Sequence, residues 1–273
     1  MTIQAKDFVF NGVSLSSFTT DYMLVSFDTS ADGNDVSIIQ TSISHTDLSA
    51  SSPIVHFYNR TPQDVLSFSI SVCREDGQYL SQENVKELQE WLFAPKVPKV
   101  AYFLPYDDNS KAVYEDIEFI GTFASSSYEE IGQVNKAGIS FSFTNIAPYA
   151  FTQIYSYDID SSSGSGSVKI ENMGTHVGET IYPQITITPA EDGTVTITNS
   201  TDTSVEPLSI NVTANTPVII KDRNLYLQDG SLYSFNNLNN FNWVAILDGM
   251  NEINVTGKCT VNIQTRFFEN VGV

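Results

Sequence analysis

The stretches that decide the fold are Ser67–Val72, which reads SFSISV, and Gly138–Phe143, which reads GISFSF. In both, apolar and hydroxyl side chains alternate. Successive side chains of a β-strand point to opposite faces, so this period of two predicts half-buried strands. Thr194–Thr198 and Thr260–Gln264 repeat the scheme with Val and Ile on one side. The sequence therefore predicts a mainly β protein.

Turn signals separate the alternating runs. Asn-Gly and Asp-Gly pairs are favoured in tight turns because both residue types tolerate a positive φ. In the second half of the chain, the spacing of the short strands is typical of a β-sandwich. These pairs are Asn11-Gly12, Asp32-Gly33, Asp76-Gly77, Asp192-Gly193, Asp229-Gly230 and Asp248-Gly249.

One segment has the period of a helix. Ser81 is a good N-cap, and Glu83 lies in the first turn, where the helix dipole favours an acid. Pro95 ends the run. We predict a helix over residues 82–93 that covers a sheet and packs Trp91 into the core. Its apolar face consists of Val85, Leu88, Trp91 and Leu92.

The domain division rests on one low-complexity run. Residues 161–167 read SSSGSGS, a composition typical of flexible linkers. No phosphate-binding loop is expected there, because the run is followed by a strand rather than a helix. We therefore predict an N-terminal β domain over residues 1–160, sandwich-like or barrel-like and with one helix. We predict a second β-sandwich over residues 168–273.

The charge balance excludes several classes of partner. The chain carries 13 Lys+Arg against 32 Asp+Glu, a formal net charge of −19. Nucleic-acid binding and adhesion to an anionic membrane both need clustered cations, so we expect neither. No apolar run approaches the length of a membrane helix. The first residues, Met1–Asp7, lack the apolar region of a secretory signal.

The sequence also predicts no enzyme, no cofactor and no metal. The histidines His45, His56 and His176 are isolated from one another. Cys73 and Cys259 are far apart and are expected to be buried thiols, and a Gly-x-Ser-x-Gly nucleophile elbow before a helix is missing. Residues 28–34, DTSADGN, resemble the start of a calcium loop, but residue 39 is Ile where such a loop needs a bidentate Glu.

Several short motifs, in this order along the chain, resemble siphophage distal tail proteins, the Dit family. The first is the opening strand and turn FVFNGVS, and the second is the helix with Trp91. The third is the strand that ends in a Pro-Tyr-Ala corner at the domain end. The fourth is GMNEINVTG near the C-terminus, followed by the aromatic strand RFF. The residues that carry the resemblance are Phe10, Asn11, Gly12, Trp91, Pro148, Tyr149, Ala150, Gly249 and Asn251.

The resemblance implies a structural role. It implies an N-terminal domain that assembles into a hexameric ring and a peripheral galectin-like C-terminal sandwich. Such a ring surrounds the DNA conduit at the tail tip or baseplate. It links the tail tube protein to the tail-associated hub protein and to receptor-binding proteins. The protein would be a virion component made in the bacterial host cytoplasm.

A lectin or adhesin is the alternative. A β-sandwich can bind glycans through exposed aromatic and amide side chains, and residues 236–240 read NNLNN. The same asparagines could instead cap a loop. Trp243 lies in an apolar strand, which favours burial over sugar stacking. We expect no measurable glycan affinity, because no convergent set of polar and aromatic residues is visible.

Overall fold

The computed structural model describes most of the chain. The calcium-like stretch Asp28–Asn34 and the pair Asp32-Gly33 lie outside the described residues. The described ranges are 5–25, 42–47, 56–61, 65–105, 117–131, 135–176 and 178–271.

The chain forms two compact units. One consists of Met1–Phe151 together with Glu269–Val273, and the other of Thr152–Phe268. The chain therefore passes between the units twice, and the last residues return to the first unit. Val271 is buried in the core of that unit.

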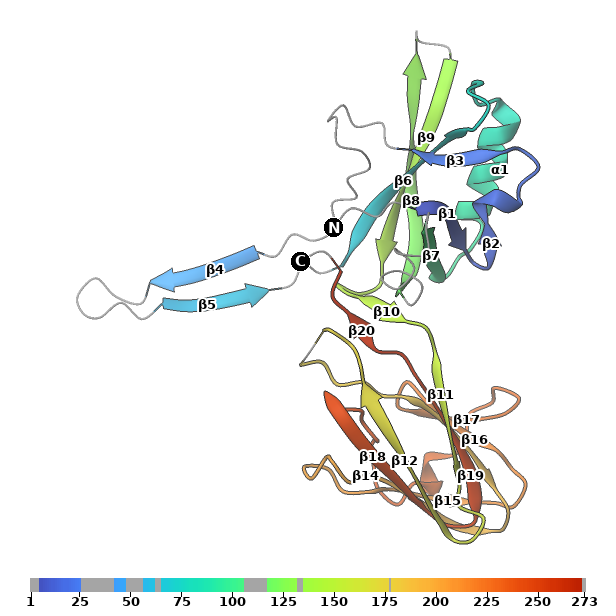
Figure 1. Ribbon diagram of the computed structural model, residues 1–273. Helices are drawn as coiled ribbons and strands as arrows, with labels where there is room; N and C mark the ends of the chain where they lie inside the picture. The colour runs from blue at the N-terminus through green and yellow to red at the C-terminus, as the bar shows by residue number, and fades with distance from the viewer. Residues whose placement is uncertain are drawn as a thin grey trace. The chain divides into compact units, whose positions relative to one another are not determined.

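The N-terminal unit is built on one antiparallel sheet (Figure 1). Its strands follow the order β2-β1-β7-β8-β9-β6-β3, and β10 pairs with β8 and β20. Because β1 also contacts β3, the sheet curls around its core, which favours the barrel-like form over the sandwich. The strands are β1 (Ala5–Phe10), β2 (Val13–Ser14), β3 (Tyr22–Val25), β6 (Ser67–Arg74), β7 (Lys99–Pro105), β8 (Ile117–Ile131), β9 (Asn135–Asn145), β10 (Ala150–Thr152) and β20 (Phe268–Glu269).

Phenylalanine rings fill this core. Phe68 stacks on Phe143 with ring centroids 4.8 Å apart, and Phe10 meets Phe123 edge to face at 5.1 Å. Offset and edge-on ring pairs are the arrangements that aromatic side chains prefer. The alternating residues of β6 and β9 supply the inner face, as predicted from SFSISV and GISFSF.

Helix α1 (Gln82–Phe93) covers the inner face and has the predicted bounds. Ser81 is the N-cap: its Oγ accepts from the backbone N–H of Asn84, and the Asn84 side chain accepts from the Ser81 backbone N–H. This reciprocal capping box satisfies two free backbone donors. Leu88 and Leu92 are fully buried, whereas Trp91 packs against the core but stays half-buried.

A separate hairpin consists of β4 (Ser42–Asp47) and β5 (His56–Thr61). The two strands pair antiparallel, with His45 opposite Tyr58 and Asp47 opposite His56. Within the described part of the chain, neither strand pairs with another sheet.

The C-terminal unit is a two-sheet sandwich with a core of Ile, Val and Leu side chains. One sheet has the order β11-β19-β13-β16-β17 and the other β12-β18-β14-β15. The predicted mainly β class is therefore confirmed in both units. The strands are β11 (Tyr155–Asp160), β12 (Ser165–Asn172), β13 (Gln184–Pro189), β14 (Gly193–Asn199), β15 (Leu208–Val212), β16 (Val218–Lys221), β17 (Asn224–Leu227), β18 (Gly249–Thr256) and β19 (Cys259–Thr265). This unit also contains the short 3-10 turn η2 (Phe235–Asn237), whereas the 3-10 turn η1 (Leu15–Ser17) belongs to the N-terminal unit.

The observed division differs from the predicted one. The prediction places a linker at residues 161–167, between domains of residues 1–160 and 168–273. Residues 161–164 turn the chain from β11 in one sheet to β12 in the other. Ser161 is fully buried, and its one hydroxyl proton is shared between the carbonyls of Gly257 and Cys259, which lie 2.7 and 2.9 Å from its Oγ. Gly164 has a φ of +108°, and a Cβ on Gly166 would lie 2.5 Å from the Asp160 carbonyl oxygen. Small residues are needed here for a tight corner, and the same composition imitates a linker.

We expect a fragment comprising residues 152–268 to fold alone, because it contains the whole second core. A fragment of residues 168–273 lacks β11, which leaves one edge of β19 unpaired and removes buried Ile159. Thermal unfolding followed by far-UV circular dichroism should show a cooperative transition for the first and a lower or absent transition for the second. Equal stability of the two fragments would contradict the observed boundary.

Candidate functional site

The first group of motif residues forms the turn between β1 and β2. Asn11 and Gly12 have φ values of +52° and +76°, the geometry of a type I′ hairpin turn. The carbonyl of Phe10 accepts a hydrogen bond from the Trp91 indole Nε1–H at 3.2 Å. The fold therefore brings Phe10 and Trp91 together, although they are far apart in sequence.

The second group, Pro148, Tyr149 and Ala150, forms the corner after β9, and buried Asn145 holds it. The Asn145 Oδ1 accepts from the Ile120 backbone N–H at 2.7 Å. Its Nδ2 donates to the carbonyls of Ala147 and Tyr149 at 3.1 and 2.7 Å. One amide thus satisfies three backbone groups where the sheet ends.

The third group, Gly249 and Asn251, lies at the start of β18. Asn251 is fully buried, and its Oδ1 accepts from the Leu247 backbone N–H and from Asn199 Nδ2, both at 2.8 Å. Its Nδ2 donates to the carbonyls of Leu247 and Gly249 at 2.8 and 3.0 Å. Asn251 therefore fixes the bend before β18, where Gly249 has a φ of +79°.

Sequence reasoning missed Asn145 and buried Asp7. The Asp7 carboxylate accepts from the hydroxyls of Ser14 and Ser16 and from the Phe8 backbone N–H. These bonds tie β1 to the segment after the first hairpin turn. A signal for Asn145 was available: it follows Phe141 and Phe143 at the alternation that predicts burial, so a polar residue there must be satisfied internally.

The outer face of the N-terminal sheet carries hydroxyl groups. Ser71 pairs with Ser140 across β6 and β9, with Oγ atoms 2.7 Å apart, and Ser69 lies opposite Ser142. On β8, Ser125 and Ser127 lie opposite Ser142 and Ser140. This hydroxyl face is polar, and it consists of Ser67, Ser69, Ser71, Thr122, Ser125, Ser127, Ser140, Ser142 and Thr144.

Within the described parts of the chain, no group of three or more His, Cys, Asp and Glu side chains could hold a metal ion. Burial raises the pKa of the Cys73 and Cys259 thiols, which disfavours the reactive thiolate. His45 and His56 lie on β4 and β5, and His176 donates its backbone N–H to Phe268.

No helix within the described ranges has the length and apolar character that a membrane crossing requires.

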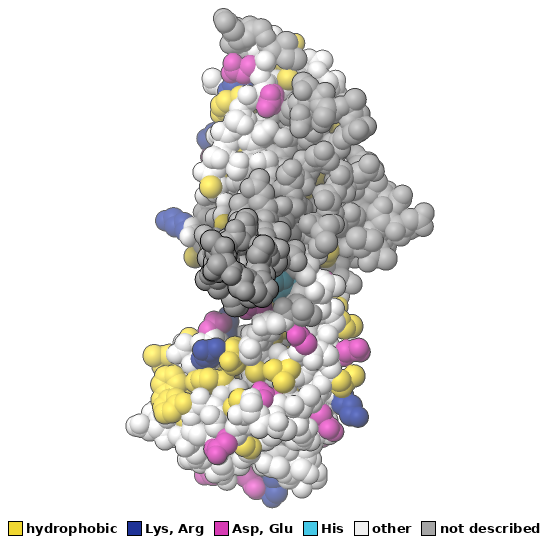
Figure 2. Space-filling model, turned by 90° about the vertical axis from the view of Figure 1, so that its left-hand side faces the viewer, with side chains coloured by type: hydrophobic (Ala, Val, Ile, Leu, Met, Phe, Trp, Pro, Cys, Tyr) yellow, Lys and Arg dark blue, Asp and Glu magenta, His cyan; other side chains and the backbone are white. Residues whose placement is uncertain are grey.

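Figure 2 shows acidic side chains scattered singly among uncharged ones over one face of the C-terminal unit.

The asparagine-rich run of the lectin alternative is engaged internally. Asn239 Nδ2 donates to Ser209 Oγ at 2.8 Å, and Asn240 Nδ2 donates to the Pro207 carbonyl at 2.7 Å. These bonds hold the run against β15. Trp243 packs, half-buried, against the C-terminal core. Loop capping therefore accounts for these residues better than sugar binding does.

We expect Asn145→Ala to lower the free energy of unfolding of the N-terminal unit by about 2–4 kcal/mol, because the Ile120 N–H loses the acceptor that Asn145 supplies and the Ala147 and Tyr149 carbonyls each lose a donor. The variants are made in a Trp243→Phe background, in which Trp91 is the one remaining tryptophan. The fluorescence of Trp91 during urea unfolding then reports the unfolding of the N-terminal unit. Asn135→Ala is the matched control, since Asn135 is exposed at the other end of β9. Equal losses in the two variants would contradict the role given to Asn145.

Comparisons with known proteins agree with this architecture. Residues 3–147 match the family described as phage tail protein N-terminal domain, and residues 149–265 match the phage tail C-terminal domain. The junction between the matches falls close to the boundary between the two compact units. No curated protein matches the chain significantly.

A solved structure shows the same fold. The crystal structure of the SPP1 Dit protein superposes with a TM-score of 0.61 at 10% identity, over 96% of this chain and 98% of that one. A protein of the phage P2 baseplate is 11% identical over 90% of this chain and 98% of that one, with a TM-score of 0.42. The resemblance to distal tail proteins is thus confirmed in the fold, and the two family matches establish that the chain belongs to the phage tail proteins.

Proposed function

We propose that this protein is a structural, non-catalytic component of a siphophage tail tip or baseplate. In this proposal, copies assemble into a ring that surrounds the DNA conduit and joins the tail tube to the hub and to receptor-binding proteins. The observation that carries it is the Dit fold over nearly the whole chain, together with the two phage tail domains. The related SPP1 protein is described as a paradigm of a hub adsorption apparatus in phages that infect Gram-positive hosts.

Unpaired strand edges support assembly of the N-terminal unit. The β4–β5 hairpin pairs only with itself among the described residues, and β3 ends the path of the large sheet. A two-stranded hairpin is marginally stable in water, and exposed edges readily pair with another chain. We infer that neighbouring copies complete these edges.

The hydroxyl face supports a role at the conduit. DNA sliding along a wall must not bind it, and cations on the wall would attach phosphates by releasing counterions. The hydroxyl face offers hydration without cations, and the net charge of −19 adds repulsion close to the surface. We propose that this face is turned to the conduit.

The remaining parts of the proposal concern partners and location. The C-terminal sandwich is proposed to be galectin-like and peripheral, where it can contact receptor-binding proteins. The motif residues from Phe10 to Asn251 are proposed to preserve the corners of the two units rather than to bind a ligand. The protein is made in the host cytoplasm, enters the virion and forms no stable complex with nucleic acid or membrane.

The ring should be visible as a change of mass in solution. We expect light scattering to give a species near six times 30.2 kDa, or partial assembly that increases with salt, because salt screens repulsion between acidic copies. A strict monomer at high protein and high salt concentration would contradict the proposal.

Lysines on the hydroxyl face should create affinity for DNA. We expect the assembled Ser69→Lys/Ser142→Lys variant to bind duplex DNA with strong salt dependence, because each copy places its cations along the same wall. The wild-type assembly should not bind. The control is Ser165→Lys/Ser167→Lys, which adds the same charge to exposed positions of β12. Fluorescence anisotropy of labelled DNA gives the comparison, and equal binding by both variants would place the conduit elsewhere.

A further inference from the structure

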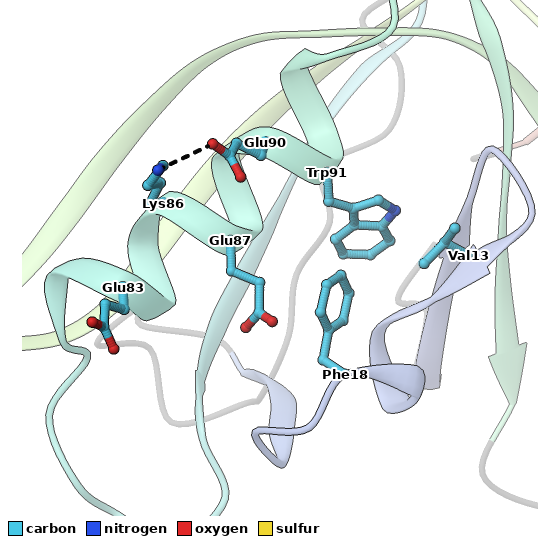
Figure 3. A pocket seen from close by; sticks show the side chains of 7 residues that line it. All are labelled: Val13, Phe18, Glu83, Lys86, Glu87, Glu90 and Trp91. Atoms are coloured by element: carbon cyan, nitrogen blue, oxygen red, sulfur yellow. Dashed lines mark ion pairs between the residues drawn. The ribbon is translucent and has the colours of Figure 1, made fainter.

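A groove lies along one side of helix α1, between the helix and the segment that follows the first hairpin turn (Figure 3). We call it the α1 groove. Its volume is about 480 Å³, and all its lining residues belong to the N-terminal unit. They are Val13, Phe18, Glu83, Lys86, Glu87, Glu90 and Trp91.

The floor of the α1 groove is aromatic and fixed. The rings of Phe18 and Trp91 point toward each other, with centroids 5.1 Å apart (Figure 3). The hydrogen bond from Trp91 to the Phe10 carbonyl holds the indole, and Phe18 also meets Tyr22 edge to face. Val13 is 39% exposed at the rim. This surface can receive an aliphatic chain or a planar cation without rearrangement.

Three glutamates, Glu83, Glu87 and Glu90, form an acidic rim of the groove, and helix stability does not account for them. Glu83 in the first turn favours the helix, but Glu90 lies in the last turn, where the dipole disfavours an acid and no basic residue compensates. Glu83 and Glu87 repel each other at a spacing of four residues. Lys86 reaches Glu90 at 3.6 Å, but a Lys that precedes its Glu is the weaker order, and both side chains are largely exposed. The net charge of the rim is therefore negative at a cost to the helix.

Glu87 is held in place at the centre of this rim. The Tyr22 hydroxyl donates to Glu87 Oε2 at 2.9 Å. Burial is the main cause that raises the pKa of Tyr22 to about 12, and this hydrogen bond is the second. The hydroxyl therefore keeps its proton at neutral pH. Figure 3 shows the Glu87 side chain beside the Phe18 ring.

We propose that the α1 groove binds an extended segment of another protein that inserts an arginine. The methylene stem would lie on Phe18 and Trp91, and the guanidinium would stack on the indole and donate to Glu87. Arginine suits this site better than lysine because its planar fork stacks on rings and pairs with carboxylates. Since this chain has 13 basic against 32 acidic residues, a basic segment is expected to come from a different protein.

The test uses the full chain with Trp243→Phe, so that emission reports Trp91 alone. The probe is a short peptide in which Arg and Val alternate, compared with peptides that carry Glu or Lys in place of Arg. We expect a saturable change in Trp91 emission with the Arg peptide. We expect weaker binding of the Lys peptide, no response to the Glu peptide, and weakening of the Arg complex by salt.

Substitutions in the rim should weaken the peptide complex in proportion to the charge removed. We expect Glu87→Gln to raise the Kd about two- to fivefold, and removal of all three rim carboxylates to raise it about tenfold or more. Glu171→Gln on β12 removes the same charge outside the groove and should leave the Kd unchanged. Circular dichroism of each variant checks that the fold is retained.

Three results would overturn the inference. The first is the absence of a saturable response to the Arg peptide. The second is unchanged Kd in the rim variants, or equal binding of the Lys peptide. The third is a change in Trp91 emission with protein concentration alone, which would show that a second copy of this chain occupies the groove.

Discussion

Backbone hydrogen bonding is the constraint on which the rest of this structure depends. A buried N–H or C=O without a partner is strongly unfavourable, so each place where a sheet ends or turns needs a substitute partner. Asn145 supplies it at the end of β9, Asn251 before β18 and Ser161 between β11 and β12. Among the described residues, no buried side-chain nitrogen or oxygen is left without a partner.

The same constraint connects the fold to assembly. The edges of β3, β4 and β5 are not completed within the described part of the chain. In a protein of −19 net charge, copies repel one another, so backbone pairing and apolar burial must offset that repulsion. The proposed assembly accounts for both observations, because in it neighbouring copies complete these edges.

Much of the fold follows from local sequence. The alternation in Ser67–Val72 and the cap at Ser81 predict strand and helix because each depends on a few neighbouring residues. The domain boundary does not, because Ser and Gly serve a tight sheet-to-sheet corner as well as a linker. The return of Glu269–Val273 to the first unit depends on long-range packing. Of the candidate surfaces, the hydroxyl face follows from alternation alone, whereas the α1 groove joins residues that only the fold brings together.

Hydrogen exchange of the chain before and after assembly tests the central claim most directly, because it observes the backbone groups themselves. The account predicts that amides of Ser42–Asp47 and His56–Thr61, which form β4 and β5, gain protection when copies assemble. Assembly that leaves the exchange of both strands unchanged would contradict it.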